Sequence, residues 1–153
     1  MSVATRTKRP DPRLDGPTEA QNLERALEVC AMFGVDVDRQ NTGGFTNPKG
    51  QYVPFGAKGN SDITGMIPWR NGCKFDLEIK RFGFRPNKLR GGKRERIRFD
   101  AQIARLRRTN EGGGVGLWID DAAVLPHVFQ RLKEGFRVEI GPDEMPYLTD
   151  EAM

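Results

Sequence analysis

The sequence is poor in the residues that most metal sites and nucleophilic sites use. It contains two cysteines and one histidine among 153 residues. Cys30 and Cys73 lie far apart in apolar segments, which is typical of free, buried thiols in a reducing compartment. Together with His127 they are too few for the usual tetrahedral zinc site. A histidine general base is not expected either, because the single imidazole falls in the last predicted helix.

Long apolar runs are also lacking. No segment approaches the roughly 18 apolar residues that a membrane span requires, and the basic N-terminus, MSVATRTKRPDPR, is not followed by the apolar stretch of a secretory signal. Charged residues make up 30% of the chain and apolar residues 37%. We therefore expect a soluble, cytoplasmic protein with one main domain, no membrane partner and no organic cofactor.

Positive charge is concentrated in one stretch, residues 81–98. This stretch has eight basic residues and one acidic residue, so it carries +7, and the rest of the chain carries −3 of the overall +4. Eight like charges repel one another unless something neutralises them, so the stretch predicts a phosphate backbone as partner. The alternative is a solvated loop without a partner. The predicted DNA-binding residues of the stretch are Arg81, Arg85, Lys88, Arg90, Lys93, Arg94, Arg96 and Arg98.

Proline, glycine and charge divide the chain into three predicted parts. Residues 1–16 contain two prolines and no periodicity, which predicts a flexible basic arm. Residues 17–140 are predicted to form the folded domain, with the basic stretch 81–98 as an insertion. Residues 141–153 are acidic and interrupted by proline, which predicts a loose tail.

Local signals predict a mixed α/β domain with the element order αβββαβα. Thr18 and Gln21 fit a capping box that begins a first helix, and Gly34 is a natural end for it. The next segment, residues 35–67, is predicted to contain strands and turns. Arg70-Asn71-Gly72 predicts a tight type I′ turn that pairs SDITGMI with CKFDLEIKR as antiparallel strands.

The second half of the domain is predicted from similar signals. Asp100 is expected to cap a helix, DAQIARLRRTN, that ends at three glycines. A short apolar strand, VGLWID, follows. The last helix, DAAVLPHVFQRLKEG, is interrupted by Pro126, and FRVEI is the candidate for a final edge strand.

Charged and apolar residues alternate in FDLEIK, residues 75–80. This alternation is typical of a half-buried strand and puts Glu78 and Lys80 on one face, as any amphipathic surface strand does by chance. The predicted hairpin lets Asp62 lie beside Glu78. Two adjacent carboxylates repel each other unless a cation lies between them, and oxygen ligands without His or Cys favour Mg²⁺ or Mn²⁺. Gly59 and Gly65, which flank the Asp62 strand, are expected to allow a ligand to approach the backbone closely.

Together, these pieces resemble the PD-(D/E)XK nuclease superfamily, and more narrowly its small stand-alone VRR-NUC members, a group common in phage genomes. The chain departs from that pattern in its long basic stretch and in having Ser61 where the superfamily name has proline. The matching segments span residues 18–134 and are TEAQNLERAL, RQNTGG, YVPFGAKGNSDITG, FDLEIKR and FDAQIARLRRTNEGGG.

The resemblance implies a restriction-endonuclease-like core, with a mixed β-sheet flanked by helices, and a metal-dependent deoxyribonuclease. It implies that Asp62, Glu78 and the backbone carbonyl of Ile79 bind Mg²⁺ or Mn²⁺. Lys80 would position the attacking water or stabilise the transition state. Gln102 would orient Lys80 or the water. The alternative for these residues is an ordinary polar surface on a hairpin and a helix.

Three more residues are candidates on weaker grounds. Glu19 matches a glutamate of the family's first helix and would add a carboxylate near the metal, although the helix dipole alone also favours glutamate there. Arg39 and Asn41, in the RQNTGG segment, would contact the phosphate or brace the site. Their alternative is a role in a turn.

The substrate is expected to be DNA recognised by shape. The sequence offers no recognition helix with base-reading side chains, and backbone contacts carry little sequence information. Stand-alone relatives act as dimers on branched DNA such as four-way junctions, so the resemblance implies a homodimer, in the host cytoplasm if a phage encodes it. The alternatives are the same chemistry on nicked, flap or specific duplex DNA, or a nucleic-acid-binding module that does not cut.

Overall fold

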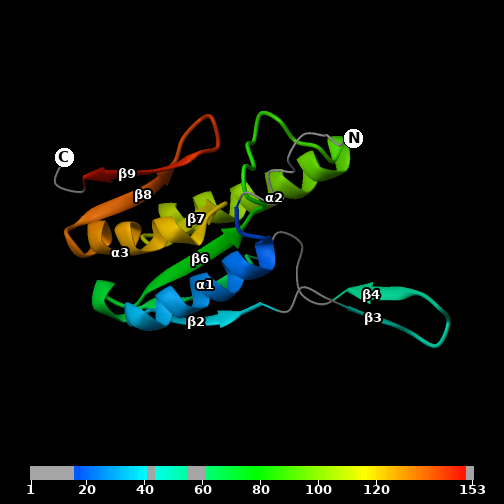
Figure 1. Ribbon diagram of the computed structural model, residues 1–153, viewed down its shortest axis with the longest axis horizontal. Coiled ribbons are helices and arrows are strands. Elements are labelled where there is room, and N and C mark those ends of the chain that lie inside the picture. The colour runs from blue at the N-terminus through cyan, green and yellow to red at the C-terminus, as the bar shows by residue number, and fades with distance from the viewer. Residues whose placement is uncertain (1–15, 41–43, 55–60, 151–153) are drawn as a thin grey trace, which may run out of the picture.

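A mixed four-stranded sheet is the frame of the molecule. The computed structural model describes residues 16–40, 44–54 and 61–150 (Figure 1). Within the sheet, β6 pairs antiparallel with β5 and parallel with β7, while β2 pairs antiparallel with β5, giving the order β2-β5-β6-β7. The strand bounds are β2 Asp36–Arg39, β5 Ile63–Ile67, β6 Cys73–Ile79 and β7 Val115–Ile119.

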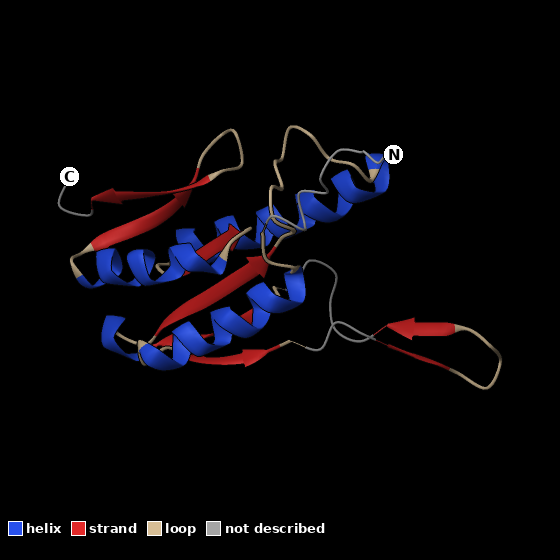
Figure 2. Ribbon diagram, viewed as in Figure 1, coloured by secondary structure: helices blue, strands red, loops and turns tan. Residues whose placement is uncertain are grey.

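Helices cover both faces of this sheet, as Figure 2 shows. Helices α1 (Glu19–Met32) and α3 (Leu125–Lys133) pack on one face in a large apolar core, and α2 (Gly92–Glu111) packs on the other face in a smaller cluster. The mixed α/β class with a helix-flanked mixed sheet is therefore confirmed. None of the described helices is long and apolar enough to cross a membrane.

Two hairpins stand outside the sheet. The first, β3 (Gly44–Thr46) and β4 (Tyr52–Pro54), is inserted between β2 and β5 and projects from the body (Figure 1). The second joins β8 (Phe136–Ile140) to β9 (Pro146–Asp150). The prediction of a loose tail was thus wrong for residues 146–150, and FRVEI is not an edge of the main sheet, because it pairs with β9.

The start and end of α1 follow the predicted chemistry. The Gln21 backbone N–H donates to Thr18 Oγ1 at 3.1 Å, and the Thr18 N–H donates to Gln21 Oε1 at 2.9 Å. Gly34 follows the last turn with a φ of +69°, a conformation that glycine adopts at little cost. The capping box and the glycine stop are both confirmed.

The connection between β5 and β6 is longer than predicted. Asn71 and Gly72 do have positive φ angles, 56° and 65°, but a 3₁₀ turn (Pro68–Arg70) precedes them. Five residues therefore join the strands, and the tight two-residue turn was wrong. The antiparallel pairing itself is confirmed, with Ile63 opposite Leu77.

Helix α2 begins eight residues before the predicted cap. It starts at Gly92, and Asp100 lies inside it, accepting hydrogen bonds from Arg96 one turn earlier. The Glu95 carboxylate accepts the Gly91 N–H at 2.7 Å and so closes the first turn. Lysine, arginine and glutamate are good helix formers once such pairs offset their charges. Residues 92–98 of the basic stretch are therefore helical.

Pro126 also has a different role from the one predicted. It lies in the first turn of α3, after a 3₁₀ turn (Ala122–Val124). A proline is tolerated there, because the first N–H groups of a helix have no intrahelical partner. It therefore begins the helix instead of interrupting it.

From Phe75 onward the strand β6 is buried on both faces, so the half-buried prediction was wrong there. Its apolar side chains Phe75, Leu77 and Ile79 enter the core beneath α1 and α3. Its charged side chains lie on the opposite face, which α2 covers. Asp76 is fully buried there and accepts hydrogen bonds from the Thr64 and Thr109 hydroxyls.

Gly65 serves the sheet and not a ligand. A Cβ atom at this position would lie 2.0 Å from the Asp36 carbonyl oxygen of β2. The missing side chain thus lets β2 approach β5, and the expectation of ligand access at this glycine was wrong. Gly59, for which the same was expected, lies outside the described residues.

Candidate active site

The register of β5 and β6 brings two carboxylates together at one end of the sheet. Because Ile63 pairs with Leu77, Asp62 falls opposite Glu78 and on the same face. One Asp62 carboxylate oxygen, Oδ2, accepts the Ile79 N–H at 2.8 Å, so the start of β5 is tied to the end of β6. Asp62 lies beside Glu78 as the sequence predicted.

Gln102 links the charged residues of β6 from the covering helix. Its Nε2 donates to Glu78 Oε2 at 2.8 Å, and its Oε1 accepts from Lys80 Nζ at 2.6 Å. Lys80 Nζ and Glu78 Oε2 are 3.9 Å apart. One buried amide therefore holds both the carboxylate and the ammonium group in fixed positions.

Two aromatic rings complete the surroundings of Lys80. Its Nζ lies 5.2 Å from the Phe84 ring centroid and 5.1 Å from that of Phe99, within the range of cation–π attraction. Burial lowers the pKa of Lys80, and the nearby Glu78 opposes that shift. Neither phenylalanine was predicted from the sequence as a site residue. The available signal was the pair Phe82 and Phe84 at the start of the basic stretch.

Glu78 is buried in a way that is unfavourable without a cation. Burial, followed by the adjacent Asp62 carboxylate, raises the pKa of Glu78 from 4.5 to about 9. Its second oxygen, Oε1, is buried and has no hydrogen-bond partner among the described residues. An orphaned carboxylate oxygen beside a second carboxylate is what a divalent cation would satisfy.

The backbone at Ile79 offers a further oxygen. In a strand, the N–H and C=O of one residue point to the same side. Since the Ile79 N–H points to Asp62, its carbonyl points to that side as well. Across the described residues, no group of three or more His, Cys, Asp or Glu side chains gathers to hold a metal. Two carboxylates with a carbonyl and waters suit Mg²⁺, which keeps several waters in protein sites.

The raised pKa of Glu78 makes the stability of the metal-free protein depend on pH. The folded state binds this proton more tightly than the unfolded chain does, so its contribution is full below about pH 4.5 and is lost as the pH rises toward 9. We therefore expect the melting temperature in EDTA to fall between pH 6 and 9. Saturating Mg²⁺ should reduce that fall, because binding displaces the proton. Equal pH slopes for wild type and Glu78→Gln would contradict this assignment.

The three weaker candidates, Glu19, Arg39 and Asn41, differ in where the structure places them. Glu19 is exposed in the first turn of α1, and its charge acts on Lys80, which places it at the margin of the site. Arg39 pairs with Ile63, so strand alternation puts it on the apolar face and not on the Glu78 face. The structure does not bring Arg39 to the carboxylates. Asn41 lies outside the described residues.

The eight basic residues of 81–98 are not equivalent. Arg81 pairs with Glu95 at 3.0 Å, Arg85 with Asp120 at 3.2 Å, and Arg96 with Asp100 and Glu144 at 2.7 Å each. Arg85 and Arg96 thus attach the stretch to the rest of the protein, and Arg81 links two parts of the stretch itself. The exposed ones without an acidic partner in the described ranges are Lys88, Arg90, Lys93, Arg94 and Arg98.

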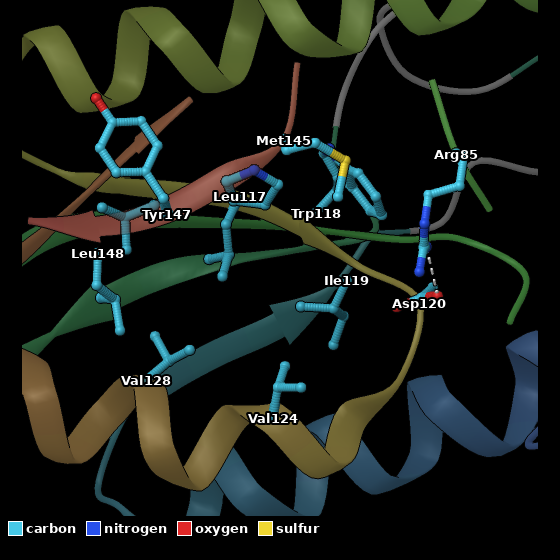
Figure 3. A pocket seen from close by; sticks show the side chains of 12 residues that line it. Arg85, Leu117, Trp118, Ile119, Asp120, Val124, Val128, Met145, Tyr147 and Leu148 are labelled. Atoms are coloured by element: carbon cyan, nitrogen blue, oxygen red, sulfur yellow. Dashed lines mark hydrogen bonds and ion pairs between the residues drawn. The ribbon is translucent and has the colours of Figure 1, made fainter. Parts of the chain in front are cut away.

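A separate cavity of about 300 Å³ lies between β7, α3 and the β8–β9 hairpin (Figure 3). Its wall is mainly apolar, with Leu117, Val128 and Leu148 pointing into it, and the Arg85–Asp120 pair stands at one end. The carboxylate pair of β5 and β6 does not line it, so we do not assign the chemistry there.

Comparisons of the chain with protein-family models, with curated proteins and with solved structures gave no match.

Proposed function

We propose that the chain is a metal-dependent DNA endonuclease with a PD-(D/E)XK core of the VRR-NUC type. The observation that carries the proposal is the convergence of Asp62, Glu78 and Lys80 at the ends of two paired strands. A buried carboxylate with an unbonded oxygen, a second carboxylate and a buried lysine form one cluster. A module that only binds phosphate has no use for two carboxylates facing that anion.

The donor set fits a hard divalent cation. Asp62, Glu78 and the Ile79 carbonyl would hold Mg²⁺ or Mn²⁺. When bound, such an ion neutralises charge on a scissile phosphate and lowers the pKa of a coordinated water.

The protein's own groups supply the remaining functions. The oxygen of water bonds to phosphorus, one P–O ester bond breaks and the leaving oxygen takes up a proton, so negative charge grows on the phosphate oxygens during the step. Lys80, because it is buried, stabilises that charge more than it could in solvent. Gln102 is a positioning residue, because it fixes Lys80 and Glu78 through its two amide atoms. Phe84 and Phe99 keep the ammonium group in place without giving it a competing anion.

The substrate is proposed to be branched DNA. The five exposed cations of the basic stretch contact phosphates, which gives affinity and orientation but little base specificity. The described part of the chain has one such carboxylate cluster, so paired cuts in two strands require a homodimer.

A panel of labelled DNA substrates tests this function. We expect Mg²⁺-dependent cutting of a four-way junction at a rate at least about tenfold above that of a linear duplex of the same sequence. Faster cutting of a nicked, flapped or specific duplex would keep the nuclease and overturn the branched substrate. Binding of every substrate with cutting of none, in Mg²⁺ and in Mn²⁺, would support a binding module instead.

A further inference from the structure

A hollow of about 430 Å³ lies at the start of α2, and we call it the arginine pocket. It combines four guanidinium groups with one carboxylate, which leaves an excess of positive charge in a concave surface. The pocket is lined by Arg81, Arg90, Gly91, Arg94, Glu95 and Arg98.

The one carboxylate of the arginine pocket is already engaged. Glu95 is buried; its Oε1 accepts the Gly91 N–H at 2.7 Å and its Oε2 accepts from Arg81 at 3.0 Å. The Gly91 N–H first, and then Arg81, lower the pKa of Glu95. Both oxygens of the Glu95 carboxylate are thus already hydrogen-bonded to other residues of the pocket wall. Glu95 therefore repels an incoming anion less than a free carboxylate would.

Arg81 is held ready by the same contact. Its guanidinium also lies over the Phe84 ring, 5.1 Å from the centroid. A guanidinium fixed between a carboxylate and a ring keeps free N–H donors in a defined direction, so little conformational entropy is lost when it binds.

The other three arginines are free to turn toward a ligand. Arg90, Arg94 and Arg98 are exposed and have no ion pair with any described residue. Arg94 and Arg98 are one turn apart on α2, and Arg90 lies just before it. The planar fork of arginine matches the oxygens of phosphate.

The arginine pocket adjoins the carboxylate cluster. Both sites meet at the Phe84 ring: Arg81 of the pocket wall lies 5.1 Å from its centroid, and Lys80 Nζ lies 5.2 Å from the same centroid. The positive charge of Arg98, also in the pocket wall, acts on Lys80 as well. A phosphate bound in the pocket would be a near neighbour of the phosphate at the metal site.

We propose that the arginine pocket binds one phosphate group of the DNA other than the scissile one. This inference rests on the proposed function for its substrate, but the binding step itself needs no metal. The bound phosphate fixes the strand relative to Lys80 and so sets where the cut falls. An internal phosphodiester and a terminal phosphomonoester both present phosphate oxygens that the pocket could bind. The test below distinguishes these two ligands.

The test compares two double variants that remove equal charge from the same stretch. Arg90→Gln/Arg94→Gln changes the pocket wall, whereas Lys88→Gln/Lys93→Gln changes exposed residues outside it. Both proteins are titrated in EDTA with inorganic phosphate, followed by NMR of the arginine side chains. They are then titrated with short single strands bearing a 5′-phosphate, a 3′-phosphate or hydroxyl ends, over a range of salt concentrations.

We expect inorganic phosphate affinity to fall at least about tenfold in the arginine variant and to stay within about twofold of wild type in the lysine variant. The lysine variant should still bind DNA more weakly than wild type, because Lys88 and Lys93 belong to the proposed DNA surface outside the pocket. Both arginines act on one phosphate, so the salt slope should fall by about 0.7 in the arginine variant. A preference of about tenfold for one phosphorylated end, lost in that variant, would identify a terminal phosphate, and no end preference an internal one.

Equal phosphate affinities of the two variants would contradict the proposal that the arginine pocket binds phosphate. A nuclease that cuts normally with such a result would leave the proposed function intact. Conversely, suppose that the wild type cuts no DNA while phosphate binding is lost only in the arginine variant. That result would support the phosphate-binding pocket and contradict the proposed nuclease activity.

Discussion

Replacing Glu78 by glutamine is expected to abolish cleavage while making the metal-free protein more stable. Glutamine keeps the shape and can still accept the Gln102 hydrogen bond, but it cannot ionise, so the cation loses a ligand. We expect the cleavage rate to fall on the order of 10³-fold. In EDTA at pH 8, stability should rise by about 2 kcal/mol or more, because folding no longer raises a carboxyl pKa. That corresponds to a melting temperature higher by roughly 4–8 °C for a chain of this size.

This pairing of lost activity with gained stability separates function from structure. If the Glu78 carboxylate served only to stabilise the fold, its replacement by glutamine would lower the stability of the protein. Glu111→Gln, at an exposed position near the end of α2, is the matched control and should leave both quantities unchanged. A destabilised Glu78→Gln protein with wild-type cleavage would reject the assigned role.

Replacing Lys80 by methionine is expected to remove cleavage without removing metal binding. Methionine has a similar length, and its sulfur packs well against the Phe84 and Phe99 rings, so the fold should persist. The charge that stabilises the transition state is lost, and we expect a decrease on the order of 10²–10³-fold in the cleavage rate at saturating metal. Mn²⁺ affinity, measured by electron paramagnetic resonance, should change less than about tenfold.

Lys74 provides the control on the same strand. It lies on the same face of β6, six residues earlier, with a half-exposed side chain. Lys74→Met should leave cleavage within about twofold of wild type. If the two methionine variants cut equally well, Lys80 has no part in the chemistry.

The sequence predicted the strand FDLEIK and the shared face of Glu78 and Lys80, but not their burial. Alternation shows that two faces differ chemically, and water is the simplest neighbour for a charged face. Here α2 covers that face instead, and Gln102 supplies the amide that makes burial tolerable. That compensation depends on the packing of α2, whose start the sequence prediction put at Asp100 instead of Gly92.

The basic stretch is a second case in which local sequence did not predict the surroundings of charged side chains. Its charge count predicted a phosphate-binding surface of eight equal residues. Three of them are fastened to carboxylates, and Arg85 and Arg96 find theirs at Asp120 and Glu144, far along the chain. Local sequence does not reveal such distant pairs. Neutralising Arg96 would therefore disturb the packing of α2 as well as the charge.

The hairpin register was predictable for a physical reason. A one-residue slip would turn the apolar side of β6 away from the core, so the pattern allows one pairing of β5 with β6. That pairing sets Asp62 opposite Glu78 even though the connecting turn differs from the predicted type. The carboxylate pair was therefore the most secure part of the candidate site.

The most direct measurement is the cutting of a labelled four-way junction by the purified protein in Mg²⁺ and in EDTA, beside the Glu78→Gln protein. The account predicts cleavage products in Mg²⁺ alone and in the wild type alone. Products that form equally in EDTA, or equally with the variant, would contradict a metal held by Asp62 and Glu78. Tight junction binding with no product under any divalent metal would contradict the nuclease itself.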